Sequence, residues 1–329
     1  MTAATLSLNE RAGRICDVLA ADAGRWRIAA QPMPCGARVI DFGVAAAGGL
    51  EAGLRLAEIC LAGLGRVSLA ANSDELGGAL GGELSGGPAV HVATDHPLAA
   101  CMASQYAGWQ IAGEKFFAMG SGPMRALARR EPLFESIAAD ETSDVAVGVL
   151  ETGKLPGDEV CRDVAAKCGV DPRRLTLCAA RTASIAGTVQ VVARSVETAL
   201  HKLHELGFDL SQVESGFGAA PLPPVAKDDL AAIGRTNDAI LYGGQTTLWV
   251  RADDDRIAEI GPRVPSSASS DHGRPFAEIF FRYDGDFYKI DPLLFSPAVV
   301  TFHNLASGRS FRFGGLEPGI LAESFRIER

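Results

Sequence analysis

The sequence has no long apolar run. No stretch approaches the roughly 18 to 20 consecutive apolar residues that a membrane-spanning helix requires. The first residues, MTAATLSLNERAGR, lack the apolar core of a secretory signal and reach a charged residue at Glu10. We therefore expect a cytoplasmic protein with no membrane segment.

Basic residues are fewer than acidic residues. The chain has 31 Lys and Arg residues against 40 Asp and Glu residues, which gives a formal net charge of −9. A protein that grips DNA or RNA electrostatically needs a basic surface to neutralise phosphates. The composition therefore disfavours nucleic acid as a partner, although a local basic pocket for a small ligand stays possible.

Paired cysteines of the CxxC type are absent. The chain contains 7 cysteines, an odd number, spread from Cys16 to Cys178. Such spacing suits neither a disulfide framework nor a structural zinc site. We expect reduced thiols and no bound metal.

The common phosphate-binding and nucleophile motifs are also missing. Residues 108–115 resemble a P-loop, but Glu114 stands where the phosphate-binding lysine should be. A possible dinucleotide fingerprint begins at Gly120 but has Arg125 at its third glycine position. No GxSxG elbow occurs. These absences disfavour a nucleotide-dependent enzyme, including a nicotinamide oxidoreductase.

What is present is an ordinary globular composition with alternating elements. Hydrophobic residues make up 47% of the sequence. The length of 329 residues is enough for about two domains at about 150 residues each. Strand-like and helix-like segments alternate through the middle of the chain, which predicts an α/β fold. The clearest strands are 145–150, 175–180 and 246–250, and the clearest helices are 158–168 and 229–242.

A long helix is predicted over residues 184–206. Its apolar stripe consists of Ile185, Val189, Val192, Val196, Leu200 and Leu203. A separate polar stripe consists of Gln190, Arg194, Glu197 and His201. Arg194 and Glu197 are three residues apart and share a helix face. Spacing alone favours an exposed salt bridge, which needs no function. Beside a substrate, the same carboxylate could activate water and the guanidinium could hold developing oxygen charge.

Four blocks of sequence together resemble the methenyltetrahydromethanopterin cyclohydrolases. Each block is short and weak alone, but they lie in the family's order and span most of the chain. The blocks are FAMGSGP followed by Arg125-Ala126, the stretch from Thr182-Ala183-Ser184 to Arg194-Ser195-Val196-Glu197-Thr198, TNDAILYGG at 236–244, and VPSS at 264–267 with FYKID at 287–291.

The resemblance implies a hydrolase of one-carbon metabolism. Such an enzyme reversibly converts N5,N10-methenyl-tetrahydromethanopterin to the N5-formyl derivative. Family members have an α/β fold of two domains with a substrate cleft between them, are homotrimeric, and need no metal or redox cofactor. A bacterial member would act on the dephosphorylated pterin in formaldehyde oxidation during methylotrophy.

The resemblance also reverses the preference for an exposed salt bridge. Arg194 and Glu197 match the family's helical Arg-x-x-Glu pair, to which catalysis is assigned. We expect Glu197 to activate water and move its proton, and Arg194 to position Glu197 and meet the new oxygen. The substrate-binding positions implied in the same way are Met119, Gly120, Ser121, Gly122, Thr182, Ser184, Gln190, Asn237 and Asp238.

Other interpretations stay open at these positions. The glycine-rich stretch 119–122 is expected to form a turn, and its glycines could serve that turn alone. Asn237 or Asp238 could instead cap local backbone. At the level of function, the alternatives are a non-catalytic pterin carrier or regulator, and a cyclohydrolase that acts on a tetrahydrofolate derivative.

Overall fold

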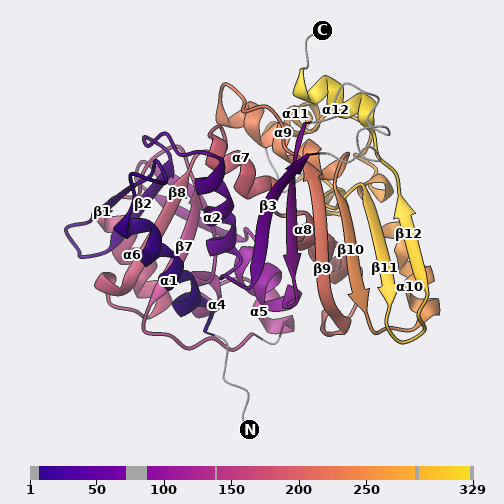
Figure 1. Cartoon of the computed structure of the whole chain (residues 1–329), viewed down its shortest axis with the longest axis horizontal. Coiled ribbons are helices and arrows are strands. Elements are labelled where there is room, and N and C mark those ends of the chain that lie inside the picture. The colour runs from indigo at the N-terminus through magenta and orange to yellow at the C-terminus, as the bar shows by residue number, and fades with distance from the viewer. Residues whose placement is uncertain (1–6, 72–86, 138, 286–288, 327–329) are drawn as a thin grey trace. The chain divides into compact units, whose positions relative to one another are not determined.

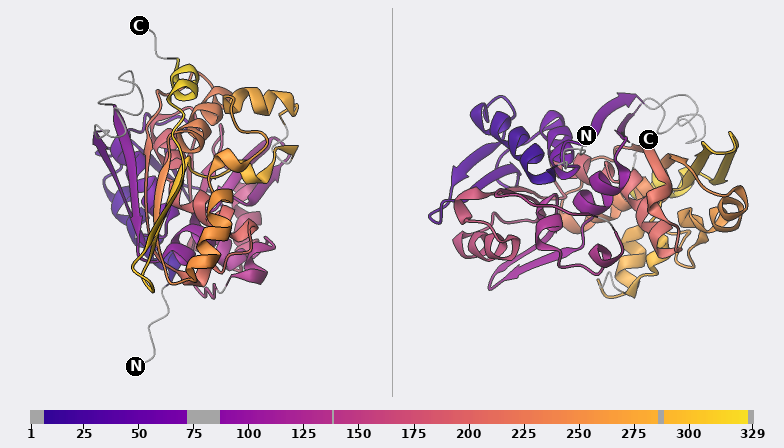
Figure 2. Two further views of the ribbon diagram at one scale, coloured as in Figure 1. Left: turned by 90° about the vertical axis from the view of Figure 1, so that its right-hand side faces the viewer. Right: turned by 90° about the horizontal axis from the view of Figure 1, so that it is seen from below.

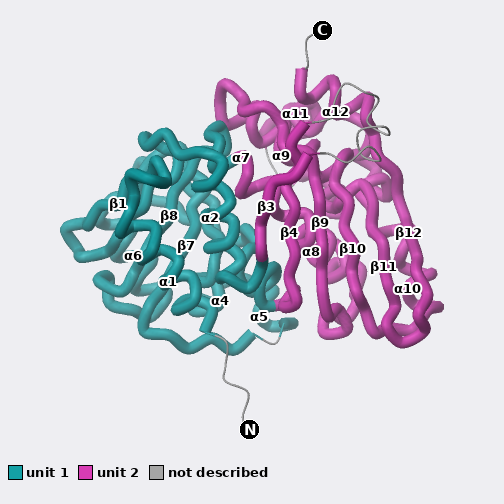
Figure 3. The backbone as a smooth tube through the Cα atoms, in the orientation of Figure 1, with its two compact units in different colours: residues 1–65, 99–187 teal, residues 66–98, 188–329 magenta. Residues whose placement is uncertain are grey.

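A computed structural model describes residues 7–71, 87–137, 139–285 and 289–326 (Figure 1). The positions 287 and 288 of the fourth family block lie outside the described residues. The chain divides into two compact units, and both combine helices with a six-stranded sheet (Figure 3). Unit 1 holds residues 1–65 and 99–187, and unit 2 holds residues 66–98 and 188–329. The predicted two-domain α/β fold is confirmed.

The sheet of unit 1 has three parallel strands at its centre. Its strand order is β1-β2-β8-β7-β6-β5, in which β2, β8 and β7 are parallel and the flanking strands are antiparallel to their neighbours. The strands are β1 (Ala29–Pro32), β2 (Arg38–Gly43), β5 (Trp109–Gly113), β6 (Phe116–Ser121), β7 (Ala146–Glu151) and β8 (Leu175–Ala180). The carboxyl ends of β2, β8 and β7 therefore meet at one edge of the sheet.

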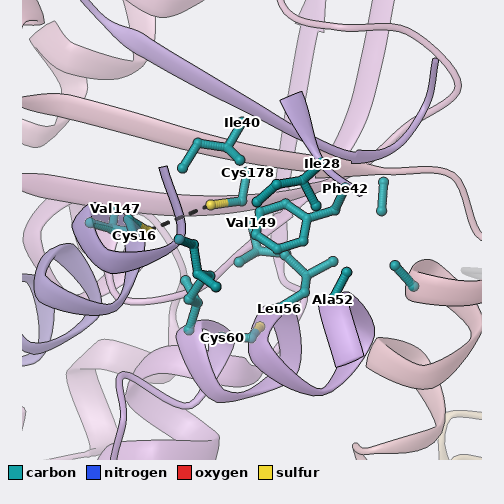
Figure 4. Close-up of a cluster of buried hydrophobic side chains, with 14 of the residues drawn as sticks. Cys16, Ile28, Ile40, Phe42, Ala52, Leu56, Cys60, Val147, Val149 and Cys178 are labelled. Atoms are coloured by element: carbon teal, nitrogen blue, oxygen red, sulfur yellow. Dashed lines mark hydrogen bonds between the residues drawn. The ribbon is translucent and has the colours of Figure 1, made fainter. Parts of the chain in front are cut away.

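Helices cover both faces of this sheet, which is why its central strands read as continuous apolar runs. One face packs against α1 (Leu8–Ala21) and α2 (Leu50–Cys60), and Figure 4 shows that core around Ile40, Phe42 and Val149. The other face packs against α4 (Met124–Ala128) and α6 (Asp158–Cys168). The remaining helical segments are α5 (Leu133–Ser136), the π-helix η1 (Leu98–Gln105) and the 3₁₀ turn η2 (Pro172–Arg174).

The sheet of unit 2 is mostly antiparallel. Its strand order is β12-β11-β10-β9-β4-β3, with β10 and β11 parallel. The strands are β3 (Gly65–Ala71), β4 (Pro88–Thr94), β9 (Val213–Pro221), β10 (Gln245–Val250), β11 (Val299–Asn304) and β12 (Ser310–Gly314). Along β10 and β11, Leu248 and Phe302 are buried while Trp249 and Thr301 are half-buried, as expected for a sheet covered mainly on one face.

The helices of unit 2 gather on one side of its strands in the left view of Figure 2. They are α8 (Ser195–Glu205), α9 (Asp229–Leu241), α10 (Asp254–Ile260), α11 (Phe276–Arg282) and α12 (Pro318–Phe325), with α7 (Ile185–Val192) spanning the division at residue 187. The 3₁₀ turns are η3 (Leu210–Gln212), η4 (Gly261–Arg263), η5 (Ser266–Ala268) and η7 (Pro292–Leu294). Among the described residues, no helix is long and apolar enough to span a membrane.

The single helix predicted over residues 184–206 is wrong. The segment forms two helices, α7 and α8, that are separated at Arg194. The Arg194 amide bonds to the carbonyl of Val191, three residues back, and Arg194 itself has φ −96° and ψ 8°. No glycine or proline marks this break, so the apolar periodicity runs through it unchanged.

The expected turn at 119–122 is also corrected. Met119, Gly120 and Ser121 belong to β6, and only Gly122 has left the strand. Gly122 has φ +87°, which favours glycine, and its amide donates to the carbonyl of Ser104 at 2.8 Å. The strand was missed because its antiparallel partners β5 and β7 are what define it.

Candidate active site

The break between α7 and α8 fixes the positions of Arg194 and Glu197. Arg194 is the N-cap residue of α8, and Glu197 lies in the first turn of that helix. The first amides of a helix have no partners within it, and the helix dipole is positive at this end. A carboxylate in the first turn is therefore favoured in its ionised form. A continuous helix would place the same side chain in mid-helix, without this benefit.

Both side chains of the pair are buried. Arg194 is 6% exposed and Glu197 is 4% exposed, so the surface salt bridge favoured by spacing alone is wrong. Arg194 Nη1 lies 3.9 Å from Glu197 Oε2, within ion-pair range but too long for a hydrogen bond. Charges taken out of water are costly unless they are paired. The opposite charges of Arg194 and Glu197 therefore offset part of each other's desolvation cost.

Gln190 orients the guanidinium from the other side of the break. Its Oε1 accepts hydrogen bonds from Arg194 Nη2 at 3.1 Å and from Arg194 Nε at 3.3 Å. Gln190 lies in α7 and is itself buried. The structure thus brings together three of the predicted site residues, Gln190, Arg194 and Glu197, with Gln190 holding Arg194 in place.

Two glycines of β9 allow the start of α8 to pack closely against the sheet. A Cβ added at Gly218 would lie 2.2 Å from Ser195 Oγ, and one at Gly216 would lie 2.7 Å from Val196 Cγ1. The Ser195 carbonyl also accepts from Thr246 Oγ1 at 3.0 Å. The first turn of α8 can approach the sheet this closely only because both strand positions lack side chains. Sequence reasoning missed these glycines, although a Gly-x-Gly pair within a strand is itself a signal of close approach.

Met119 and Thr182 are brought together in unit 1, around a carboxylate that was not predicted. Met119 of β6 is the register partner of Glu151, the last residue of β7. The buried hydroxyl of Thr182 donates a short hydrogen bond to Glu151 Oε1. The available signal for Glu151 was its place directly after a predicted buried strand, where polar residues of α/β sheets meet ligands.

Ser121 and Ser184 have local structural partners. Ser184 Oγ accepts from the Gly187 amide at 3.0 Å and donates to the Arg181 carbonyl at 2.7 Å, so it caps α7. Ser121 Oγ is buried and donates to the carbonyl of Val149 at 3.3 Å. These hydroxyls hold the backbone on which Met119 and Thr182 lie.

Asn237 and Asp238 on α9 also make local contacts. Asn237 Nδ2 donates to the carbonyl of Ile233 at 2.8 Å, within its own helix. Asp238 is fully buried and accepts from the Phe276 amide at 2.7 Å and from Ser324 Oγ at 2.6 Å, so it joins α9 to α11 and α12. Burial raises the pKa of Asp238 to about 7. These contacts are the ones expected if the pair serves local backbone.

The seven cysteines are all free, and all but the half-buried Cys35 are buried. Cys16 Sγ and Cys178 Sγ lie 3.7 Å apart in the core shown in Figure 4. In the part of the chain that the structure describes, no group of three or more His, Cys, Asp or Glu side chains could hold a metal ion.

The comparisons with known proteins place this chain in a family of cyclohydrolases. Residues 7–325 match the family model described as Cyclohydrolase (MCH). The chain therefore belongs to that family, as the four sequence blocks predicted. Its relatives carry the particular name methenyltetrahydromethanopterin cyclohydrolase. The relative from Rhodopirellula baltica is 52% identical over 300 residues, which cover 89% of this chain and 87% of the relative.

Two further relatives match nearly the whole chain. The protein of that name from Methylobacillus flagellatus is 46% identical over 320 residues, covering 97% of this chain and 95% of its own. The one from Methanococcoides burtonii is 41% identical over 325 residues, which cover 98% of this chain and 99% of the relative. The similarity therefore extends through both units.

Proposed function

We propose that this protein hydrolyses N5,N10-methenyl-tetrahydromethanopterin to N5-formyl-tetrahydromethanopterin, reversibly. The observation that carries the proposal is the buried Arg194–Glu197 pair at the start of α8. The names of relatives at 41% to 52% identity support the same substrate.

The substrate's chemistry explains why an arginine and a carboxylate suffice. The methenyl bridge is an amidinium cation, so its carbon is electrophilic before the enzyme acts. What the reaction needs is a group that attracts the cation and accepts a proton from water. At about 4 Å and an effective dielectric constant near 20, a carboxylate and a cation attract by about 4 kcal/mol before desolvation.

Glu197 is the proposed base. As the water oxygen bonds to the methenyl carbon, one water proton passes to Glu197, and the product is a neutral hydroxylated tetrahedral carbon. Collapse breaks the bond from carbon to N10, the hydroxyl proton moves to N10, and the formyl group stays on N5. Glu197 then releases its proton to solvent, so each turnover in this direction yields one proton.

Arg194 is the proposed partner of the new oxygen. Its guanidinium favours the ionised form of Glu197, which is the form that accepts a proton. It can also donate to the oxygen that gains charge as the tetrahedral carbon collapses. Gln190 holds the guanidinium in one orientation, so little reorganisation is needed during the reaction.

The test is a spectrophotometric assay of the purified protein, followed at the methenyl absorption band. We expect rapid loss of the band with methenyl-tetrahydromethanopterin, little with methenyl-tetrahydrofolate, and no effect of a chelator. Rapid turnover of the folate substrate instead would indicate the folate cyclohydrolase. Binding of the methanopterin substrate without acceleration would indicate a carrier or regulator.

The proposal also covers the oligomeric state, the cofactor requirement, the form of the substrate and the metabolic role. We propose a cytoplasmic homotrimer that uses neither metal nor redox cofactor and prefers the dephosphorylated pterin, in formaldehyde oxidation during methylotrophy. The support is the family resemblance. Sedimentation equilibrium tests the trimer, and a comparison of kcat/KM for the phosphorylated and dephosphorylated substrates tests the preference.

A further inference from the structure

Glu151 lies in a row of residues that crosses four strands of unit 1. Gly43 of β2 and Glu151 of β7 are both register partners of Ala180 in β8, and Met119 of β6 is the register partner of Glu151. The row runs along the edge at which the three parallel strands end. In open α/β sheets, this edge is where ligands bind.

Two carboxylates lie at this edge, and they are used differently. Asp41 is buried, and its two oxygens accept four backbone hydrogen bonds, from the amides of residues 43–46 at 2.6 to 2.9 Å. Glu151 is half-buried. Its only side-chain partner within the described residues is the hydroxyl of Thr182, which donates to Oε1. Asp41 is thus saturated by its own loop, whereas Glu151 retains capacity to accept.

The surroundings of Glu151 fix its orientation. Its backbone is held in the sheet on both sides, and Thr182 is buried within hydrogen-bonding distance. An ionised carboxylate has about four acceptor positions, and Thr182 occupies one. The other acceptor positions of the carboxylate, including both positions on Oε2, have no protein donor in the described part of the chain. A preoriented acceptor of this kind suits a ligand that presents N–H groups.

We propose that Glu151 is a specificity-determining residue that binds the pterin ring of the substrate through its N3–H and 2-amino groups. The inference rests on the proposed function, which supplies the pterin. These two donors lie side by side and point the same way, so the two oxygens of one carboxylate can accept both, as they do from an arginine fork. Such charge-assisted bonds are stronger than those between neutral groups.

The geometry assigns Glu151 to binding and not to proton transfer. The hydrogen bond from Thr182 holds the carboxylate in one orientation, which suits it to bind a ligand. The methenyl bridge itself carries no N–H group for such an acceptor. Glu151 should therefore affect substrate affinity, whereas Glu197 should affect turnover.

The first experiment compares KM and kcat of the wild type and Glu151→Gln with methenyl-tetrahydromethanopterin. Glutamine keeps the size of the side chain but turns one acceptor into a donor. We expect KM to rise about 10-fold to 100-fold, the range for losing a hydrogen bond to a charged group, and kcat to change less than about 3-fold. The matched control is Asp95→Asn, because Asp95 is an exposed carboxylate that also accepts from a hydroxyl, that of Ser215; its KM should not change.

The second experiment tests the ring edge directly. The inhibitors are 6,7-dimethyl-tetrahydropterin and the matching lumazine, which has a carbonyl in place of the 2-amino group. The wild type should bind the pterin at least about 10-fold more tightly, and Glu151→Gln should lose that preference. Thr182→Val, which leaves the carboxylate intact but unanchored, should lose part of it and serves if the first variant does not fold.

The outcomes separate the two proposals. An unchanged KM in folded Glu151→Gln, or no preference for pterin over lumazine in the wild type, overturns the assignment of Glu151 while the hydrolase proposal stands. A wild type without turnover overturns the hydrolase proposal. In that case calorimetric binding of the pterin and the lumazine still decides the assignment of Glu151.

Discussion

At the scale of single residues, Glu197 is the group on which turnover should depend. Glu197→Gln preserves volume but cannot take a proton from water, so we expect kcat to fall about 10²-fold to 10⁴-fold with a much smaller change in substrate affinity. Single-turnover kinetics and equilibrium binding measure the two quantities. Glu205→Gln, on an exposed position of the same helix, is the control. Near-normal turnover in a folded Gln variant would remove Glu197 from this role.

Arg194 gives a second prediction at this scale. Arg194→Ala removes the cation beside Glu197 and leaves Gln190 without its partner, so we expect a clear loss of kcat. Arg194→Lys keeps the charge but not the two bonds to Gln190, and should recover only part of the loss. Steady-state kinetics of the three proteins provide the check. Equal kcat values in all three would contradict a role in catalysis.

The residue scale also shows what spacing can and cannot predict. The sequence spacing places Arg194 and Glu197 on one face, but it contains no information about burial, and burial is what excludes the surface pair. Glu151 was missed for a related reason. Its neighbour Thr182 lies 31 positions away in sequence, and only the pairing of β7 with β8 brings the two together.

At the scale of elements, the contact between α8 and β9 is the feature most open to a test. Gly218→Ala places a Cβ against Ser195 and forces the start of α8 away from the strand. We expect a loss of about 1 to 3 kcal/mol in the free energy of unfolding and a lower kcat, because Glu197 moves with the helix. Denaturant titration and kinetics measure the two effects. Gly315→Ala is the control, since no heavy atom lies within 4 Å of its added Cβ. Equal stability and equal kcat in the two variants would contradict the close packing of α8 against Gly218.

Elements with strong periodicity were predicted well, and those defined by their partners were not. The helix at 158–168 and the strand at 175–180 have the predicted bounds, because a buried parallel strand and an amphipathic helix each have a clear local pattern. β9 was missed because Gly216 and Gly218 replace the side chains that mark a strand. The break at Arg194 was missed because neither glycine nor proline marks it and the apolar periodicity continues through it.

At the scale of the whole molecule, Asp238 should make stability depend on pH. Burial raises its pKa to about 7 in the folded protein, from an ordinary value of 3.8. Between these values the folded state holds a proton that the unfolded state has released. The contribution of Asp238 to the free energy of unfolding should therefore decrease as pH rises from about 4 to about 7 and level off above that.

The variant Asp238→Asn isolates this contribution. An amide can still accept from the Phe276 amide but does not ionise, so the decrease with rising pH should be smaller in the variant. Denaturant titrations of both proteins at several pH values between about 4 and 8 measure the difference. A difference that is independent of pH would show that Asp238 keeps one protonation state throughout.

The division of the chain into two units has a consequence for synthesis on the ribosome. Unit 1 is built from two separate segments, and its β2 pairs with β8 in the register Arg38 with Thr176. The sheet therefore cannot be completed when residues 1–65 emerge, and β4 must wait still longer for β9. Until more than half of the chain has been synthesised, β2 lacks β8 and β4 lacks β9, so each exposes an unpaired strand edge, which is the situation that chaperones relieve. Refolding from denaturant should accordingly be slow, because the centre of the first sheet requires the long-range pairing of β2 with β8.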